Sequence, residues 1–305
     1  MAALKPQVKL ALIGLFLIFC LLFLSSNTDN RTTIQKVFNH HEEVPLFKKW
    51  HDCASQSFNF SETADQFWNS CINHVKKCDK LIDSNVSMKL LPFRNKDEYK
   101  YAILPLIGMV EPEVENYVVT IGIGKDVMAE TALRNKTEEL GANTKFFGAD
   151  PMFMDNFEIF SQIGTYFPLA ISGSDGFFEA SVLFKKKYKN VEVFHINLVY
   201  FIKNILKIKT IDHLWMDNEY GEYSLFPYFH ENGQLDEAGI TVCQLNMEVH
   251  KASADQKELY KEFIRRLLED RRYALLKQVT AAKHHRLYFF NFGNDYCVDK
   301  FIEMK

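Results

Sequence analysis

Tyr117-Val118-Val119-Thr120-Ile121-Gly122-Ile123-Gly124 is a run of apolar and β-branched residues that ends on two closely spaced glycines. A run of this kind is typical of a strand buried on both faces of a sheet. The glycines indicate a tight turn directly after the strand, where missing side chains let the backbone approach a ligand closely. An ordinary tight turn without a ligand is the alternative interpretation.

Strands and helices alternate from this stretch toward the C-terminus. Further strands are expected over 145–149, 166–171, 191–196, 211–216, 240–247 and 287–291, with a turn-rich insertion at 172–176. Helices are expected over 126–140, 156–163, 198–208 and 255–270. This order predicts an α/β fold with a Rossmann-like, doubly wound sheet. In such a sheet, ligands bind at the carboxyl ends of the strands.

The N-terminus carries an apolar segment. Lys5 and Lys9 precede an uninterrupted apolar run over 10–24, which just reaches the length of a short membrane span. A cleaved signal peptide is the alternative, but bulky residues stand where its small residues would be expected. Because positive charges favour the cytosolic side, residues 1–26 are expected to be a cytosolic tip and signal-anchor helix. The protein would then be a single-pass type II membrane protein of the Golgi or ER, with its remaining chain in the lumen.

Residues 27–112 are expected to form a stem and a small helical cap, and residues 113–305 the main domain. A helix that begins with Ser61 as its N-cap would carry Cys71 and Cys78 about 10 Å apart along its axis. That separation is too long for a mutual disulfide.

The cysteines and the glycosylation sequons also favour an oxidising, lumenal environment. Cys53 is expected to pair with a cysteine of the helix after Ser61, and one thiol is left over by the odd count. Cys243 is interpreted as a buried apolar residue of a strand. The four sequons begin at Asn30, Asn59, Asn85 and Asn135.

Acidic residues follow two of the expected strands. Asp150 ends the second strand 26 residues after Gly124, close to the spacing at which an acid reaches the ribose of an adenine-containing ligand. The strand at 211–216 is followed by Asp217, Glu219 and Glu222. Solvated loop acids are the alternative interpretation, but acids directly after a buried strand favour a functional site.

These residues resemble those of a known family, the FkbM-type methyltransferases. The resemblance rests on the stretches 117–124, 147–151 and 211–222, and the run 240–250 is similar to the family's following strand. It covers about residues 115 to 292. It implies S-adenosylmethionine as cofactor and methylation of an oxygen on a hydroxylated acceptor, either a small molecule or a glycan.

The resemblance also implies roles for individual residues. Gly122 and Gly124 would pass the methionine part of the donor, Asp150 would bind its ribose, and Asp217 would face the acceptor. The possible bases for the acceptor proton are Glu219, Glu222 and His250. No residue is assigned to a metal ion on this interpretation.

Two positions depart from the family pattern. Many methyltransferases have an acidic residue in the first strand where this chain has Thr120. In the signature Asp-x-Glu-Gly-x-Glu, Tyr220 occupies the glycine position and Gly221 follows one place later. These departures favour a second possibility, a non-catalytic binding protein with the same fold.

A glycosyltransferase is the third possibility, because an anchor, a stem and a lumenal α/β domain also describe those enzymes. Asp217 and Glu219 would then hold manganese against a diphosphate. A nucleic-acid partner is not expected, because a net charge of −3 and a pI near 6.4 give no basic surface. The sequence predicts no oligomeric state.

Overall fold

The computed structural model describes residues 44–83, 88–106, 115–184 and 187–302. The anchor expected over 1–26 lies outside these residues. Among the described helices, none is both long enough and apolar enough to cross a membrane.

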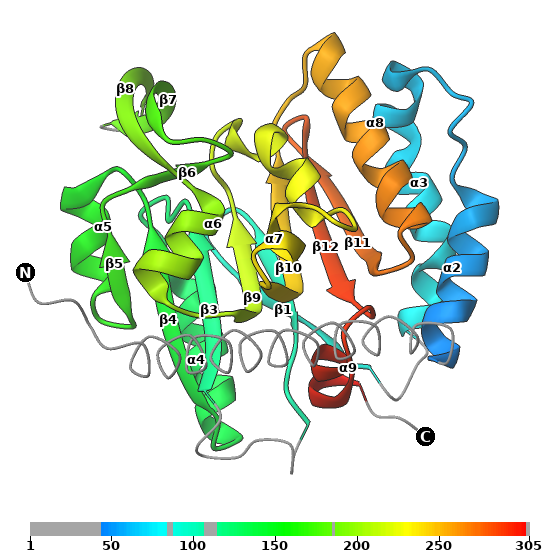
Figure 1. The fold of residues 1–305 in the computed structure, drawn as a ribbon, viewed down its shortest axis with the longest axis horizontal. Helices are drawn as coiled ribbons and strands as arrows, with labels where there is room; N and C mark the ends of the chain where they lie inside the picture. Colours follow the sequence, from blue (N-terminus) through cyan, green and yellow to red (C-terminus); the bar gives the residue numbers. More distant parts are fainter. Residues whose placement is uncertain (1–43, 84–87, 107–114, 185–186, 303–305) are drawn as a thin grey trace, which may run out of the picture. The chain divides into compact units, whose positions relative to one another are not determined.

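A seven-stranded sheet forms the centre of the fold, in the order β11-β12-β10-β9-β3-β4-β5 (Figure 1). The five strands from β10 to β5 are parallel, whereas β12 is antiparallel to both of its neighbours. The strands are β3 (Glu115–Ile121), β4 (Asn143–Ala149), β5 (Thr165–Phe167), β9 (Thr210–Met216), β10 (Thr241–Val249), β11 (Tyr273–Ala281) and β12 (His284–Asn291).

The strand order reverses between β3 and β9. After β3 the chain continues outward through β4 and β5, and then it returns to place β9 on the other side of β3. A crevice forms at such a switch point because the two connections leave the sheet in opposite directions. The confirmed prediction is therefore a mixed α/β fold with a central, largely parallel sheet that is compatible with a Rossmann-like methyltransferase.

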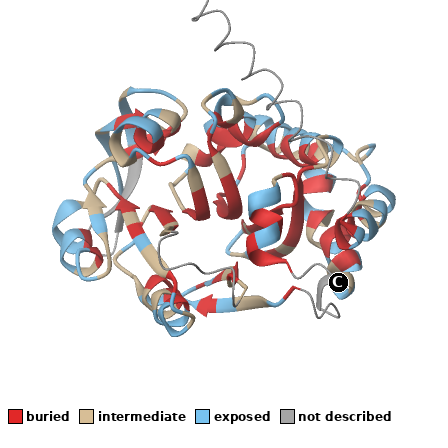
Figure 2. Cartoon of the chain, turned by 60° about the horizontal axis from the view of Figure 1, so that its bottom comes forward, coloured by how far each residue is buried: buried red, intermediate tan, exposed pale blue. Residues whose placement is uncertain are grey.

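Both faces of the sheet are covered, because side chains of one strand point alternately to the two faces. Val118 packs against Leu133 and its neighbours in one cluster, whereas Val119 belongs to the larger cluster. Figure 2 shows buried residues concentrated in the central strands and exposed residues on the outer helices. The helices of this part are α4 (Met128–Glu139), α5 (Phe153–Phe160), α6 (Leu198–Tyr200) with a π-helical turn (Phe201–Leu206), a 3₁₀ segment (Gly221–Phe229), α7 (Gln234–Glu237), α8 (Ala254–Glu269) and α9 (Asp295–Phe301).

Residues 44–83 and 88–106 pack onto this sheet. Helices α2 (Pro45–Ser57) and α3 (Ala64–Asp83) contact each other, α8 and β11, and they share the larger hydrophobic cluster. Strands β1 (Leu90–Arg94) and β2 (Tyr99–Ile103) form an antiparallel hairpin.

The hairpin is held by side chains of β10. Gln244 binds both backbone groups of Ile103, and Asn246 binds both backbone groups of Tyr101, at 2.7–3.0 Å. Polar side chains inside an apolar strand therefore fix this hairpin against the sheet.

The expected strand over 166–171 is wrong as a single element. β5 belongs to the large sheet, whereas β6 (Ala170–Ser172) belongs to a small sheet with β7 (Gly176–Phe184) and β8 (Lys187–Asn197). Pro168 lies between β5 and β6 and has no N–H to continue a ladder. The insertion thus leads into a hairpin, whose first strand the sequence did not predict.

The N-cap of α3 is Thr63 rather than the predicted Ser61. Oγ1 of Thr63 accepts a hydrogen bond from the backbone of Gln66, and the side chain of Gln66 accepts one from the backbone of Thr63. This reciprocal pair is a capping box. Ser61 instead donates both its N–H and its hydroxyl to Asn59.

The cysteine predictions are confirmed in one case and wrong in the other. Cys53 bonds to Cys78, and Cys71 is a buried free thiol. Cys243 is not merely a buried apolar residue, because it forms a disulfide with Cys297 of α9 across a Cα–Cα distance of 5.2 Å. β12 runs antiparallel to β10, so α9, which follows β12, lies near the start of β10, where Cys243 stands.

Candidate active site

A cavity of about 280 Å³ lies at the switch point between β3 and β9. The ends of β3, β4 and β9 line it from the sheet, the β1–β2 hairpin lines it from one side, and His195 of β8 contributes from the small sheet. Four residues assigned to the site from the sequence are in this lining besides Asp150, namely Gly122, Gly124, Asp217 and Glu219.

The turn after β3 requires glycine for two different reasons. Gly122 and Gly124 have positive φ angles of 80° and 61°, which favour glycine. A Cβ atom on Gly122 would lie 1.7 Å from the backbone oxygen of Asp217, whereas one on Gly124 would meet nothing within 4 Å. Gly122 therefore allows the ends of β3 and β9 to approach, and Gly124 leaves its side of the cavity open.

Asp150 holds the same turn from the end of β4. Its Oδ2 accepts hydrogen bonds from the backbone N–H of Ile123 (2.9 Å) and of Gly124 (3.4 Å), and its Oδ1 accepts one from Met152 (2.7 Å). Burial nevertheless raises the pKa of Asp150 above its usual value, against the effect of these bonds. The carboxylate thus lies beside the glycine turn, as the sequence led us to expect, and it also shapes that turn.

Thr120 stands where many methyltransferases have an acid, and here a carboxyl reaches it from α4. The Thr120 hydroxyl donates to Oε1 of Glu130 over 3.1 Å. Burial raises the pKa of Glu130 to about 7, and its Oε2 accepts no hydrogen bond from the described residues. Glu130 also lines the cavity, so an acidic group is present near the position that Thr120 leaves neutral.

Carboxylate and imidazole groups gather where the carboxyl end of β9 lines the cavity. Nε2 of His250 lies 3.4 Å from Oδ1 of Asp217 and 3.4 Å from Oε2 of Glu219. Nδ1 of His250 lies 3.2 Å from Oε1 of Glu222, which also accepts the backbone N–H of His250 at 2.8 Å. Glu222 is fully buried. Although Glu222 and His250 do not line the cavity, Glu222 fixes the ring that faces Asp217 and Glu219.

The electrostatics of this group favour a protonated imidazole. Burial lowers the pKa of His250, but its hydrogen bond to Glu222 and the charges of Glu222, Asp217 and Glu219 outweigh burial and raise that pKa to about 9. Desolvation and the nearby charge of Glu248 raise the pKa of Asp217. A charged His250 is therefore a poor base as it stands in this structure.

Several groups around this cluster were missed from the sequence. Nζ of Lys100 lies 2.6 Å from Oε1 of Glu98, and Nε of Arg286 lies 2.9 Å from Oε2 of Glu248. Both Lys100 and Glu98 come from β2 and its turn, within the stretch that the sequence assigned to the stem. The signal that could have found Glu248 is the polar series Gln244, Asn246, Glu248 within an apolar strand.

Tyr220 does not belong to the cavity lining. Its φ of 76° is the left-handed conformation that the glycine of the family signature would adopt freely. The ring is 45% exposed and lies 5.1 Å from the His250 ring, centroid to centroid. The substitution therefore affects the backbone conformation and the outer side of His250.

Comparison with known proteins agrees with this geometry. The family model described as Methyltransferase FkbM domain matches residues 59–275, which is more than half of the chain. The match begins within the region of α2 and α3 and ends in β11, so it includes the glycine turn, Asp150 and the acidic cluster. None of the curated proteins compared with the chain matches it significantly.

Proposed function

Because the chain belongs to the Methyltransferase FkbM domain family, we propose that it transfers a methyl group from S-adenosylmethionine to a hydroxyl oxygen. The observation that carries this proposal is the position of Asp150, whose carboxylate accepts hydrogen bonds from the glycine turn and which lines the cavity at the switch point. A donor ribose there would find a charged acceptor beside a backbone that has no side chains to block it.

The charge of the cavity supports a cationic donor. Seven carboxylate residues line it and only three lysines do: Asp97, Glu98, Asp126, Glu130, Asp150, Asp217 and Glu219 against Lys96, Lys100 and Lys125. An acidic cavity attracts a sulfonium group directly, whereas a diphosphate would need a metal ion between it and the carboxylates. The cationic donor of the methyltransferase therefore needs no additional ion in this cavity.

The acceptor would enter from the side of the Asp217 and Glu219 carboxylates, at the end of β9, which meets the glycine turn through the backbone of Asp217. A hydroxylated small molecule or a glycan would suit this side, because carboxylates accept hydrogen bonds from hydroxyl groups and a protonated imidazole donates to hydroxyl oxygens. Methyl transfer requires the acceptor oxygen to be aligned with the donor carbon and its proton to be removed.

Calorimetry with S-adenosylmethionine and S-adenosylhomocysteine tests the donor site. Asp150→Ala should weaken donor binding roughly 10- to 150-fold, since hydrogen bonds to a charged group contribute about 1.5–3 kcal/mol. Asp217→Asn should reduce activity and leave donor binding nearly unchanged, because it lies on the acceptor side. Equal binding by Asp150→Ala and the wild-type protein would refute the donor assignment.

The same measurement separates the alternatives. Thermal stabilisation by a nucleotide sugar with manganese, but not by S-adenosylhomocysteine, would favour a glycosyltransferase. Absence of binding to either donor in the millimolar range would favour a non-catalytic protein of the same fold.

We also propose that the protein is anchored by its N-terminal segment in a membrane of the secretory pathway, with the described domain in the lumen. Two disulfides, Cys53–Cys78 and Cys243–Cys297, support an oxidising compartment. Lys5 and Lys9 before the apolar run support the orientation. Membrane extraction with carbonate and protease protection of intact vesicles test the anchor and the orientation separately.

A further inference from the structure

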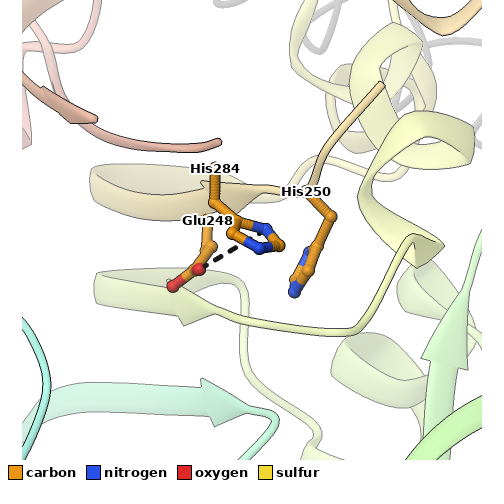
Figure 3. A group of neighbouring side chains, drawn as sticks. All are labelled: Glu248, His250 and His284. Carbon is orange, nitrogen blue, oxygen red and sulfur yellow. Dashed lines mark ion pairs between the residues drawn. The ribbon is translucent and has the colours of Figure 1, made fainter. Parts of the chain in front are cut away.

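A mixed cluster of carboxylates and imidazoles lies at the carboxyl ends of β9 and β10. Asp217 and Glu219 follow β9, Glu248 and His250 stand at the end of β10, and His284 begins β12. Figure 3 shows Glu248, His250 and His284 side by side, with an ion pair between Glu248 and His284. Potential ligand atoms of Asp217, Glu219 and His250 lie within 4.8 Å of one another, and so do those of Glu248, His250 and His284.

The distances around His250 fit a shared ion better than direct hydrogen bonds. Its Nε2 lies 3.4 Å from an oxygen of Asp217 and 3.4 Å from an oxygen of Glu219. Charge-assisted hydrogen bonds are shorter, at about 2.7–2.9 Å. Two ligand atoms that lie about 2.0–2.2 Å from one tetrahedral ion are separated by roughly 3.3–3.6 Å.

Glu222 holds the ring of His250 from within the same cluster. It is fully buried, and its Oε1 accepts from both the backbone N–H and the Nδ1 side of His250. In metal sites, the ring nitrogen of histidine that does not bind the metal commonly donates its N–H to a carboxylate. That hydrogen bond fixes the ring and directs the other nitrogen to the ion. His250 is only 4% exposed, so a buried imidazole is aimed at the two carboxylates.

The charges of the cluster leave room for a cation. Five carboxylates gather here with two permanent cations: Glu98, Asp217, Glu219, Glu222 and Glu248 with Lys100 and Arg286. Lys100 pairs with Glu98, which forms one group with Asp217 and Glu248, so this cation lies within the cluster, and the carboxylates still outnumber the cations by five to two. Oδ1 of Asp217 is buried and accepts no hydrogen bond from the described residues. Lys100 pairs with Glu98, and Arg286 pairs with Glu248.

We infer that His250, Asp217 and Glu219 form a binding site for one divalent transition-metal ion, with Glu222 as the group that positions His250. One imidazole and two carboxylates suit ions such as Mn²⁺ or Zn²⁺. The ion would take the place of the proton on Nε2 of His250, which is released to solvent, while Nδ1 keeps its proton toward Glu222. Since Asp217 and Glu219 line the cavity, the ion faces it and takes a hydroxyl oxygen of the acceptor as a further ligand. This last step rests on the proposed methyltransferase function and specifies its acceptor side: an oxygen-rich molecule such as one with neighbouring hydroxyls.

Calorimetric titration of the chelator-treated full chain with MnCl₂ and ZnCl₂ tests the site. Electron paramagnetic resonance spectra of Mn²⁺ give a second readout of ion binding. One ion per chain is expected. Asp217→Asn and Glu219→Gln should each weaken binding at least about 10-fold, and Glu222→Gln about 10- to 100-fold. The matched control is Glu138→Gln, which changes an exposed acid of α4 outside both the cavity lining and the cluster, and this variant should bind the ion as the wild-type chain does.

Three outcomes are informative. No binding in the millimolar range by the wild-type chain, or equal binding by Glu219→Gln and the wild-type chain, overturns the metal site. Glu219 is partly exposed, so its variant keeps the test valid should His250 or Glu222 variants not fold. Metal binding without S-adenosylmethionine binding supports the site and refutes the methyltransferase. Binding of S-adenosylmethionine without binding of metal refutes the metal site and supports the methyltransferase.

Discussion

Oδ2 of Asp150 lies 2.9 Å from the backbone nitrogen of Ile123, so the end of β4 holds the turn that follows β3. The carboxylate accepts three backbone N–H groups in all, and Asp150 is 8% exposed. The residue that is proposed to bind the donor therefore also builds the surface on which the donor would lie.

Asp150→Ala is accordingly expected to lower stability as well as donor affinity. Leaving buried N–H groups without acceptors costs about 1–3 kcal/mol each, reduced where water replaces the carboxylate. Urea denaturation should show a loss of at least about 1 kcal/mol. Asp150→Asn retains one acceptor oxygen and should lose less. Equal stability of all three proteins would mean that the turn does not depend on this side chain.

The two glycines of the turn should respond differently to alanine. In Gly122→Ala the new Cβ meets the backbone of Asp217 at 1.7 Å, so the ends of β3 and β9 must separate. We expect poor folding or a loss of several kcal/mol, on the order of a severe overpacking. In Gly124→Ala the new Cβ meets nothing within 4 Å. The only expected loss of stability comes from placing alanine at a positive φ, which costs about 1–2 kcal/mol. Thermal unfolding of the pair measures the difference, and equal losses would contradict this account.

The fold could be predicted from the sequence where periodicity and strand length were strong. The runs that became β3, β4, β9 and β10 are rich in apolar residues, and most residues of β3, β9 and β10 are buried because both faces of these strands are covered. β11 was not predicted, although it begins Tyr273-Ala274-Leu275-Leu276. Its pairing with β12 shifts register between Leu275 and Lys277, so the alternation that marks a strand is interrupted there.

The site could be predicted only where its residues follow strands of the parallel sheet. Gly122, Asp150 and Asp217 belong to that set, because the topology alone brings strand ends together. Glu98 and Lys100 reach the cavity through a hairpin that is fixed by Gln244 and Asn246, more than 140 residues later. No local pattern near residue 100 contains that information.

The disulfides predict a distinct reactivity for each cysteine of the described residues. Peptide mapping without reduction should link Cys53 to Cys78 and Cys243 to Cys297. Cys71 should stay free and resist alkylation until the protein unfolds, since burial raises the pKa of its thiol to about 12. Loss of the bridge between α2 and α3, in Cys53→Ser with Cys78→Ser, should lower stability by about 3 kcal/mol. Rapid alkylation of Cys71 in the native protein would contradict its burial.

The two described sequons should differ in glycosylation if the domain is lumenal. Asn59 is exposed between α2 and α3, and its Oδ1 accepts hydrogen bonds from Ser61 of the same sequon. Asn135 lies within α4, where Thr137 of its sequon is buried. Glycosidase treatment should increase gel mobility, and Asn59→Gln should remove more of that shift than Asn135→Gln. No shift in the wild-type protein would count against the lumenal proposal.

Glu130 should make stability depend on pH. Burial raises the pKa of this carboxyl from its ordinary 4.5 to about 7 in the folded chain, so the folded state binds the proton more tightly than the unfolded state does. Its contribution to stability is therefore complete below about pH 4.5, falls as the pH rises, and is lost above about pH 7. The difference between the two pKa values corresponds to about 3 kcal/mol.

Glu130→Gln cannot ionise, so it should remove this loss while keeping an oxygen that accepts from Thr120. Urea denaturation of both proteins between about pH 4 and pH 8 should show the variant gaining on the wild-type protein as the pH rises. The matched control is Glu138→Gln, which changes an exposed carboxyl on the same helix and should leave the profile as it is. Parallel profiles for Glu130→Gln and the wild-type protein would mean that the Glu130 carboxyl is solvated in the folded chain, and its place in the wall of the cavity would have to be reconsidered.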